Sequence, residues 1–155
     1  MILSAGVILY RRAHERLVVL LAHPGGPYWI RKDAGAWSIP KGECGDGEEP
    51  LAAALREFEE ETGIKLEGGL EPLGEVKQAG GKIVRAWTVE RDCDPTQIHS
   101  NTFSLEWPPK SGKIQEFPEI DRFEWFPIAE ARQKLVKAQT AFLDRLADRI
   151  KQGAK

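Results

Sequence analysis

Hydrophobic residues repeat along the chain with two periods, one typical of strands and the other of helices. Residues 2–10 and 16–22 are apolar and partly β-branched, and the short polar segment between them predicts a β-hairpin. Further strands are predicted at residues 74–78, 82–90, 102–107 and 122–126, and helices at residues 48–62, 128–136 and 139–150. Because these elements interleave without regular strand–helix–strand alternation, the pattern predicts a mixed sheet flanked by helices.

The segment over residues 48–62 carries the strongest helix signals. Pro50 suits the first turn of a helix, and Gly63 suits the left-handed residue that often follows the last turn. At about 100° per residue, one side of this helix is apolar. That side carries Leu51, Leu55 and Phe58, with Ala54 at its margin.

Three glutamates share a neighbouring face of the same helix. Glu57, Glu60 and Glu61 stand at positions i, i+3 and i+4. Like charges at this spacing destabilise a helix, and the helix dipole disfavours anions near the C-terminal end. Spacing alone leaves two interpretations open: a solvated acidic face, or a site for a hard cation such as Mg²⁺, which suits phosphate-ester chemistry.

Composition and charge narrow the class of protein. The 155 residues favour one domain over residues 1–155, and 41% hydrophobic with 30% charged residues excludes wholesale disorder. The longest apolar run, residues 17–22, is far shorter than the roughly 20 residues of a spanning helix. Cys44 and Cys93 lie far apart, which favours reduced thiols and a cytoplasmic protein. The net charge of -2 gives no reason to expect a nucleic-acid or membrane partner, although residues 48–61 hold six glutamates and one arginine.

These acidic residues belong to a longer motif. Gly42 is followed by glutamate at residue 48 and by Arg-Glu-Phe-Glu-Glu-Glu-Thr-Gly-Ile at residues 56–64. This 23-residue segment resembles the Nudix box, with all nine defining positions filled. The resemblance implies an α/β fold, the Nudix-type α/β/α sandwich with a mixed β-sheet and a catalytic loop–helix–loop. It also implies a hydrolase that cleaves a diphosphate linkage in a nucleoside diphosphate derivative by water attack at phosphorus, with Mg²⁺ or Mn²⁺ as cofactor.

The resemblance assigns roles to individual acidic residues of the motif. Glu60 and Glu61 correspond to metal ligands. Glu57 corresponds to a third carboxylate that either binds metal or acts as the base on water, and this choice stays open. Lys41, immediately before the box, is expected to offer its backbone carbonyl to a metal.

Four other residues of the motif are expected to support these ligands. Arg56 and Glu48 would pair within the motif and orient the catalytic carboxylates. Gly42 and Gly63 are expected to be required for the backbone conformation and to take no part in the chemistry.

A further acidic metal ligand is expected outside the box, before a strand that carries a tryptophan. Glu119, six residues before Trp125, is the predicted ligand, with an exposed loop glutamate as the alternative. Glu116 is the second choice and Glu124 the third, because Glu124 alternates with apolar residues inside a predicted strand.

Substrate contacts are expected from the segments before the box, which resemble a bacterial branch described as predicted NTP pyrophosphohydrolases. The candidate substrate-binding residues are Lys41, Arg31, Tyr28 and Trp29. Lysine and arginine suit a polyphosphate, and an aromatic ring in a Gly/Pro loop suits a base. Residues 92–118 form a long, turn-rich segment that is expected to act as a lid or specificity loop. The histidines His14, His23 and His99 show no metal-ligand spacing and receive no role.

The expected partner is a small-molecule nucleotide, an NTP or a dinucleoside polyphosphate, and the expected assembly is a monomer or homodimer. Two alternatives remain. One is a Nudix-fold module that binds a nucleotide and regulates without hydrolysis, although such modules commonly have an eroded box. The other is an RNA 5′ pyrophosphohydrolase, which the absence of a basic signature disfavours.

Overall fold

A six-stranded mixed sheet forms the centre of the computed structural model, which describes residues 2–98 and 100–153. The strands follow the order β4-β5-β1-β2-β8, and β3 pairs with β1. The bounds are β1 Leu3–Ala13, β2 Arg16–Pro24, β3 Lys41–Glu43, β4 Glu71–Lys77, β5 Ile83–Glu90 and β8 Ile120–Pro127. β1 runs parallel to β5 and antiparallel to β2, so the predicted hairpin and the predicted mixed sheet are both confirmed.

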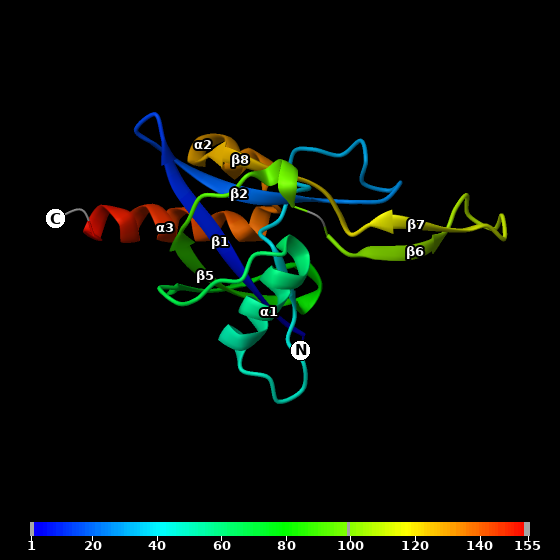
Figure 1. The fold of residues 1–155 in the computed structure, drawn as a ribbon, viewed down its shortest axis with the longest axis horizontal. Helices are drawn as coiled ribbons and strands as arrows, with labels where there is room; N and C mark the ends of the chain where they lie inside the picture. Colours follow the sequence, from blue (N-terminus) through cyan, green and yellow to red (C-terminus); the bar gives the residue numbers. More distant parts are fainter. Residues whose placement is uncertain (1, 99, 154–155) are drawn as a thin grey trace.

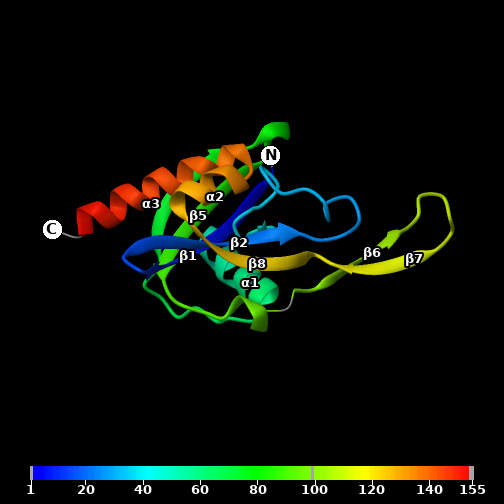
Figure 2. The ribbon, with the colours of Figure 1, turned by 90° about the horizontal axis from the view of Figure 1, so that it is seen from above.

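Helices cover both faces of this sheet, as Figure 2 shows. They are α1 Pro50–Thr62, α2 Ile128–Lys134 and α3 Thr140–Gly153, and short 3-10 turns lie at Ala79–Gly81, Pro95–Gln97 and Lys137–Gln139. Strand alternation divides the apolar residues between two cores. Val7 and Leu9 of β1 pack with Phe58 of α1, whereas Ile8 packs on the other face with Leu143 of α3. The result is an α/β/α sandwich.

A close backbone contact brings the segment before α1 onto the sheet. A Cβ at Gly6 would lie 2.5 Å from the carbonyl oxygen of Pro40, and the Val7 N–H donates to the same oxygen at 3.1 Å. Residues 41–43 can therefore pair with β1 as β3. This contact places the start of the box directly against the central strand.

Outside the sandwich, β6 (Thr102–Glu106) and β7 (Ile114–Pro118) form a separate antiparallel hairpin that extends away from the body (Figure 1). It occupies most of the predicted lid segment at residues 92–118. The hairpin packs on the loop after β2, where the rings of Tyr28 and Trp107 meet edge to face at 5.1 Å.

Several predicted boundaries and faces are corrected by the structure. The apolar pattern predicts neither β3, which depends on pairing with the distant β1, nor β7, which forms a hairpin with the preceding β6 and is largely exposed. Helix α1 begins at Pro50, and the strand expected at residues 74–78 begins at Glu71. Leu51 is 39% exposed, so its expected place on the apolar side is wrong. The buried residues of α1 are Ala53, Ala54, Phe58 and Thr62.

Cys44 and Cys93 are both free. His99 lies outside the described residues. Among the helices in residues 2–98 and 100–153, none has both the length and the apolar character to cross a membrane.

Candidate active site

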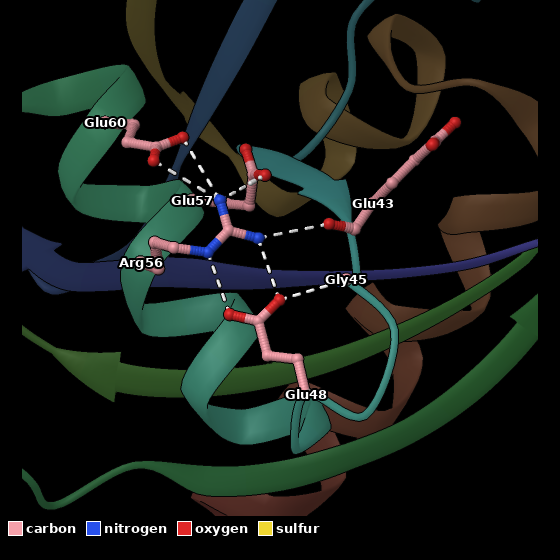
Figure 3. Close-up of polar contacts among 6 residues, drawn as sticks. All are labelled: Glu43, Gly45, Glu48, Arg56, Glu57 and Glu60. Atoms are coloured by element: carbon pink, nitrogen blue, oxygen red, sulfur yellow. Dashed lines mark hydrogen bonds and ion pairs between the residues drawn. The ribbon is translucent and has the colours of Figure 1, made fainter.

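Arg56 is the centre of the polar contacts around α1 (Figure 3). Its Nε and Nη2 donate to both carboxylate oxygens of Glu48, at 2.8 and 2.9 Å. Its Nη1 donates to Glu57 at 2.9 Å and to Glu60 at 3.3 Å, and Nη2 also reaches the carbonyl of Glu43. The predicted pairing of Arg56 with Glu48 is thus present. One guanidinium joins the loop before the helix to two of the three acidic residues on its face.

Glu48 lies in the loop before α1, and its side chain is turned back onto that loop. Its Oε1 accepts from the Gly45 N–H at 2.8 Å while the carboxylate also binds Arg56. These contacts, with Arg56 the larger, lower the pKa of Glu48 to about 2. The carboxylate is therefore ionised at neutral pH and holds the loop against the helix.

The carboxylate of Glu57 lies against the backbone of the box glycine. A Cβ on Gly42 would stand only 2.0 Å from Cδ and Oε2 of Glu57. Gly42 does not have a positive φ, so its backbone requirement is this close approach, whereas Gly63 has φ 76° and ends α1 in the left-handed conformation. Burial raises the pKa of Glu57, and Arg56 opposes that rise.

Glu61 is the third glutamate on this face of α1, and it is not among the partners of Arg56. Its Oε2 is buried and has no hydrogen-bond partner. Burial, followed by the charge of Glu57, raises the pKa of Glu61 to about 8, while the charge of Lys41 lowers it and that of Glu119 raises it. Burial also lowers the pKa of the Lys41 ammonium, which Glu61 partly restores. A buried carboxylate in this state is suited to bind a cation.

A pocket of about 230 Å³ opens beside Glu61. Its polar lining includes Lys41 and Glu119, and Trp29 contributes an aromatic wall. The remaining lining residues are Ala22, Pro24, Ala36, Ser38, Ile39 and Ile120. An apolar pocket with a few polar groups beside charged residues is typical of a small-molecule site.

The pocket brings together some predicted substrate residues and not others. Lys41 and Trp29 line it, whereas Tyr28 and Arg31 are exposed side chains of the same loop that do not. Of the three acidic candidates outside the box, Glu119 lines the pocket. All three side chains are exposed, Glu119 between β7 and β8, Glu116 on β7 and Glu124 on β8. The functional roles of all these residues stay predictions.

The box residues fit a hard divalent cation in the chemistry of their donors. Within residues 2–98 and 100–153, no three His, Cys, Asp or Glu side chains already converge as a metal cage. The ion pairs of Arg56 with Glu57 and Glu60 are part of the reason that these carboxylates do not converge. The buried Oε2 of Glu61, which has no hydrogen-bond partner, supports this fit to a cation. When ionised, such an oxygen requires a compensating positive charge.

Two buried polar residues that sequence reasoning did not identify support the pocket. Gln139 is fully buried; its Oε1 accepts from the Ile39 N–H at 3.0 Å, and its Nε2 donates to Gln78 at 2.8 Å. His23, which received no role, is fully buried at the end of β2. A polar residue at the end of an apolar strand was the available signal for His23. No local signal marks Gln139, whose partners lie 61 and 100 residues away.

A family model described as the NUDIX domain matches residues 2–146. The chain belongs to the Nudix family. This Nudix chain is 35% identical over 115 residues to an RNA pyrophosphohydrolase of Brucella anthropi, a match that covers 64% of this chain and 61% of that protein.

Solved structures agree with the fold of this Nudix chain. An Ap4A hydrolase of C. elegans has a TM-score of 0.67 at 21% identity, covering 98% of this chain and 99% of that one. The NUDIX domain of Shewanella oneidensis NrtR, complexed with ADP ribose, has a TM-score of 0.64 at 16% identity, covering 97% and 88%. The predicted Nudix sandwich and the predicted membership of the Nudix family are confirmed. The chain spans about three fifths of the length of its curated relative from Brucella anthropi, 61%.

Proposed function

We propose that this Nudix chain hydrolyses a diphosphate linkage in an NTP or a dinucleoside polyphosphate by water attack at phosphorus, with Mg²⁺ or Mn²⁺ as cofactor. One observation carries the proposal: Glu61, whose Oε2 is buried without a hydrogen-bond partner, lines a pocket together with Lys41, Glu119 and Trp29. The pocket thus combines acidic residues for a cation, an ammonium for phosphate and a ring for a base. The names of the relatives support the same reaction class.

Glu57, Glu60 and Glu61 would hold the cation, with the backbone carbonyl of Lys41 and the carboxylate of Glu119. When bound, a divalent cation lowers the pKa of a coordinated water and neutralises charge on phosphate oxygens. Arg56 supports these ligands through its bonds to Glu57 and Glu60.

The chain's own groups would supply the remaining functions. Glu57 serves either as a ligand or as the base that takes the proton of the attacking water. The Lys41 ammonium contacts the polyphosphate as a point charge. Trp29 stacks on the base at the pocket rim, and Tyr28 and Arg31 contact parts of the substrate that extend outside the pocket.

The proposal includes a cytoplasmic location and a monomer or homodimer without nucleic-acid or membrane partners. A regulatory module without hydrolysis is the alternative from another class, and the intact Arg56 network argues against it. An RNA 5′ pyrophosphohydrolase is the other alternative, suggested by the name of the Brucella anthropi relative. Release of products distinguishes all three.

The test is a substrate panel with Mg²⁺ or Mn²⁺, from neutral to alkaline pH. It contains NTPs, dinucleoside polyphosphates, NDP-sugars and an RNA with a 5′ triphosphate, and chromatography identifies the products. Glu60→Gln and Glu61→Gln should abolish turnover with the fold retained, whereas Glu59→Gln, an exposed position on the same helix, should not. No turnover of any substrate by the wild-type protein would refute the proposal.

A further inference from the structure

His23 is a fully buried histidine at the end of β2 that the proposed reaction leaves unused. Its Nδ1 lies 2.7 Å from Oδ1 of Asp121 on β8. Its Nε2 lies 2.6 Å from the backbone carbonyl oxygen of Lys32, in the loop after β2. The ring also meets the buried Trp37 edge to face, with centroids 5.0 Å apart. Both ring nitrogens and one ring edge are thus held.

The direction of one of these hydrogen bonds follows from its chemistry. A backbone carbonyl only accepts, so Nε2 of His23 donates to Lys32. Asp121 on the neighbouring strand holds the opposite nitrogen and prevents the ring from turning away. The ring therefore connects a fixed point of the sheet to one carbonyl of an exposed loop.

Lys32 is in turn connected to Trp29 by its backbone and its side chain. The Lys32 N–H donates to the Trp29 carbonyl at 2.9 Å, and the Trp29 N–H donates to the Gly26 carbonyl at 3.2 Å. The Lys32 ammonium lies 4.8 Å from the centre of the Trp29 ring, within cation–π distance. Residues 28–35 are exposed, and the position of Trp29 depends on the contacts at the base of the loop and on the ring contact of Tyr28 with Trp107.

Trp29 is the residue through which this chain of contacts reaches the site. It is 41% exposed, and it lines the pocket together with Glu61, Lys41 and Glu119. A loop that moved by an ångström or two would carry the ring away from the pocket, while α1 and its carboxylates would stay in place.

We propose that His23 is a positioning residue for substrate: by donating to the Lys32 carbonyl, it holds the Trp29 ring at the pocket rim, where the ring stacks on the substrate's base. This inference rests on the proposed nucleotide substrate. It assigns His23 to binding of the base and gives it no part in the reaction at phosphorus. Loss of the contact should therefore raise KM and leave kcat unchanged.

Two substitutions separate this role from simple packing. An asparagine amide reaches the position of Nδ1 and can keep the Asp121 contact, whereas a glutamine amide reaches the position of Nε2 and can still donate to Lys32. Both variants lose the ring contact with Trp37 equally. With a nucleotide that the wild-type protein turns over, His23→Asn should raise KM about tenfold with kcat within about twofold, and His23→Gln should leave KM within about twofold.

A double-mutant cycle tests whether the effect passes through Trp29. In a Trp29→Ala background, His23→Asn should leave KM unchanged, because the ring that it positions is gone. Equal KM values for His23→Asn and His23→Gln would overturn the proposal, as would an additive effect in the Trp29→Ala background.

A measurement without substrate keeps the inference separate from the proposed function. Hydrogen–deuterium exchange of the amides in residues 26–33 should be faster in His23→Asn than in the wild-type protein, and unchanged in His23→Gln. If the wild-type protein hydrolyses nothing, the proposed function fails, and the exchange comparison still decides whether His23 holds the loop. Identical exchange in both variants would refute that anchoring.

Discussion

Glu61→Gln should stabilise the metal-free protein at neutral pH while it abolishes activity. The substitution keeps the size of the side chain and removes the charge from a buried oxygen that has no hydrogen-bond partner. The carboxyl of Glu61 has a pKa of about 8 in the folded chain against an ordinary value of 4.5, because burial disfavours its charged form. The folded state thus binds a proton that the unfolded chain releases over this pH range.

The effect of Glu61 on the free energy of unfolding follows from the difference between its pKa values in the folded and unfolded chain. Below pH 4.5 both states are protonated, and Glu61 contributes no pH dependence. Between pH 4.5 and 8 the unfolded state alone is ionised, so stability falls by about 1.4 kcal/mol per pH unit. At pH 7 the loss amounts to about 3 kcal/mol, and above the folded pKa it levels off. A neutral glutamine lacks this loss, which corresponds to a melting temperature about 6–12 °C higher for a chain of this size.

Urea unfolding of both proteins from pH 5 to pH 9, with EDTA present, measures the difference directly. The two free energies of unfolding should agree near pH 5 and diverge as pH rises. Glu59→Gln is the matched control on the same helix and should follow the wild-type curve. Addition of Mg²⁺ should stabilise the wild-type protein and leave Glu61→Gln unchanged. Parallel curves for wild type and Glu61→Gln in EDTA would show that ionisation of Glu61 does not lower the stability of the fold, which would refute the reasoning.

Three further substitutions test other contacts of the site. Arg56→Lys removes the guanidinium fork, so kcat/KM should fall by about 10- to 100-fold with an unchanged circular dichroism spectrum; wild-type kinetics would contradict the supporting role. Gly42→Ala places a Cβ 2.0 Å from the Glu57 carboxylate, so steady-state turnover should be lost, and a fully active variant would disprove the close approach. Gln139→Leu leaves the Ile39 N–H without its acceptor, so urea unfolding should report a loss of about 1–3 kcal/mol, and an unchanged midpoint would count against it.

Much of the fold could be predicted because its long elements carry their own pattern. The apolar run of β2 and the end signals of α1, Pro50 and Gly63, are local properties. β3 carries no such pattern: it forms because Gly6 lets residues 39–41 approach β1, which depends on contact between distant segments. Leu51 was misplaced for a related reason. Helix α1 packs its small residues Ala53 and Ala54 against the sheet, and the helical period alone does not fix which side is buried.

Some residues of the site could likewise be predicted from local spacing, whereas others are brought together only by contacts between distant segments. Glu57, Glu60 and Glu61 fall on one helix, so their spacing was sufficient to group them. Glu119 is selected in the sequence by its place before Trp125, but its position in the pocket wall depends on the crossing of two loops, where the Gly25 N–H donates to the Glu119 carbonyl at 2.9 Å. The pattern around His23 gives no sign of its role, because one partner is a loop carbonyl and the other, Asp121, lies on a strand 98 residues away.

The distribution of hydrogen bonds over the three box carboxylates explains how α1 tolerates them. Arg56 compensates Glu57 and Glu60, and the close approach of Gly42 gives the Glu57 carboxylate its place beside the loop. Glu61 alone of the three has a buried oxygen without a partner, and it is the one that lines the pocket. A fold selected for stability alone would have placed a neutral side chain there. A cation at the proposed site would compensate this carboxylate, and the gain in stability on its replacement by glutamine would measure what its retention costs the fold.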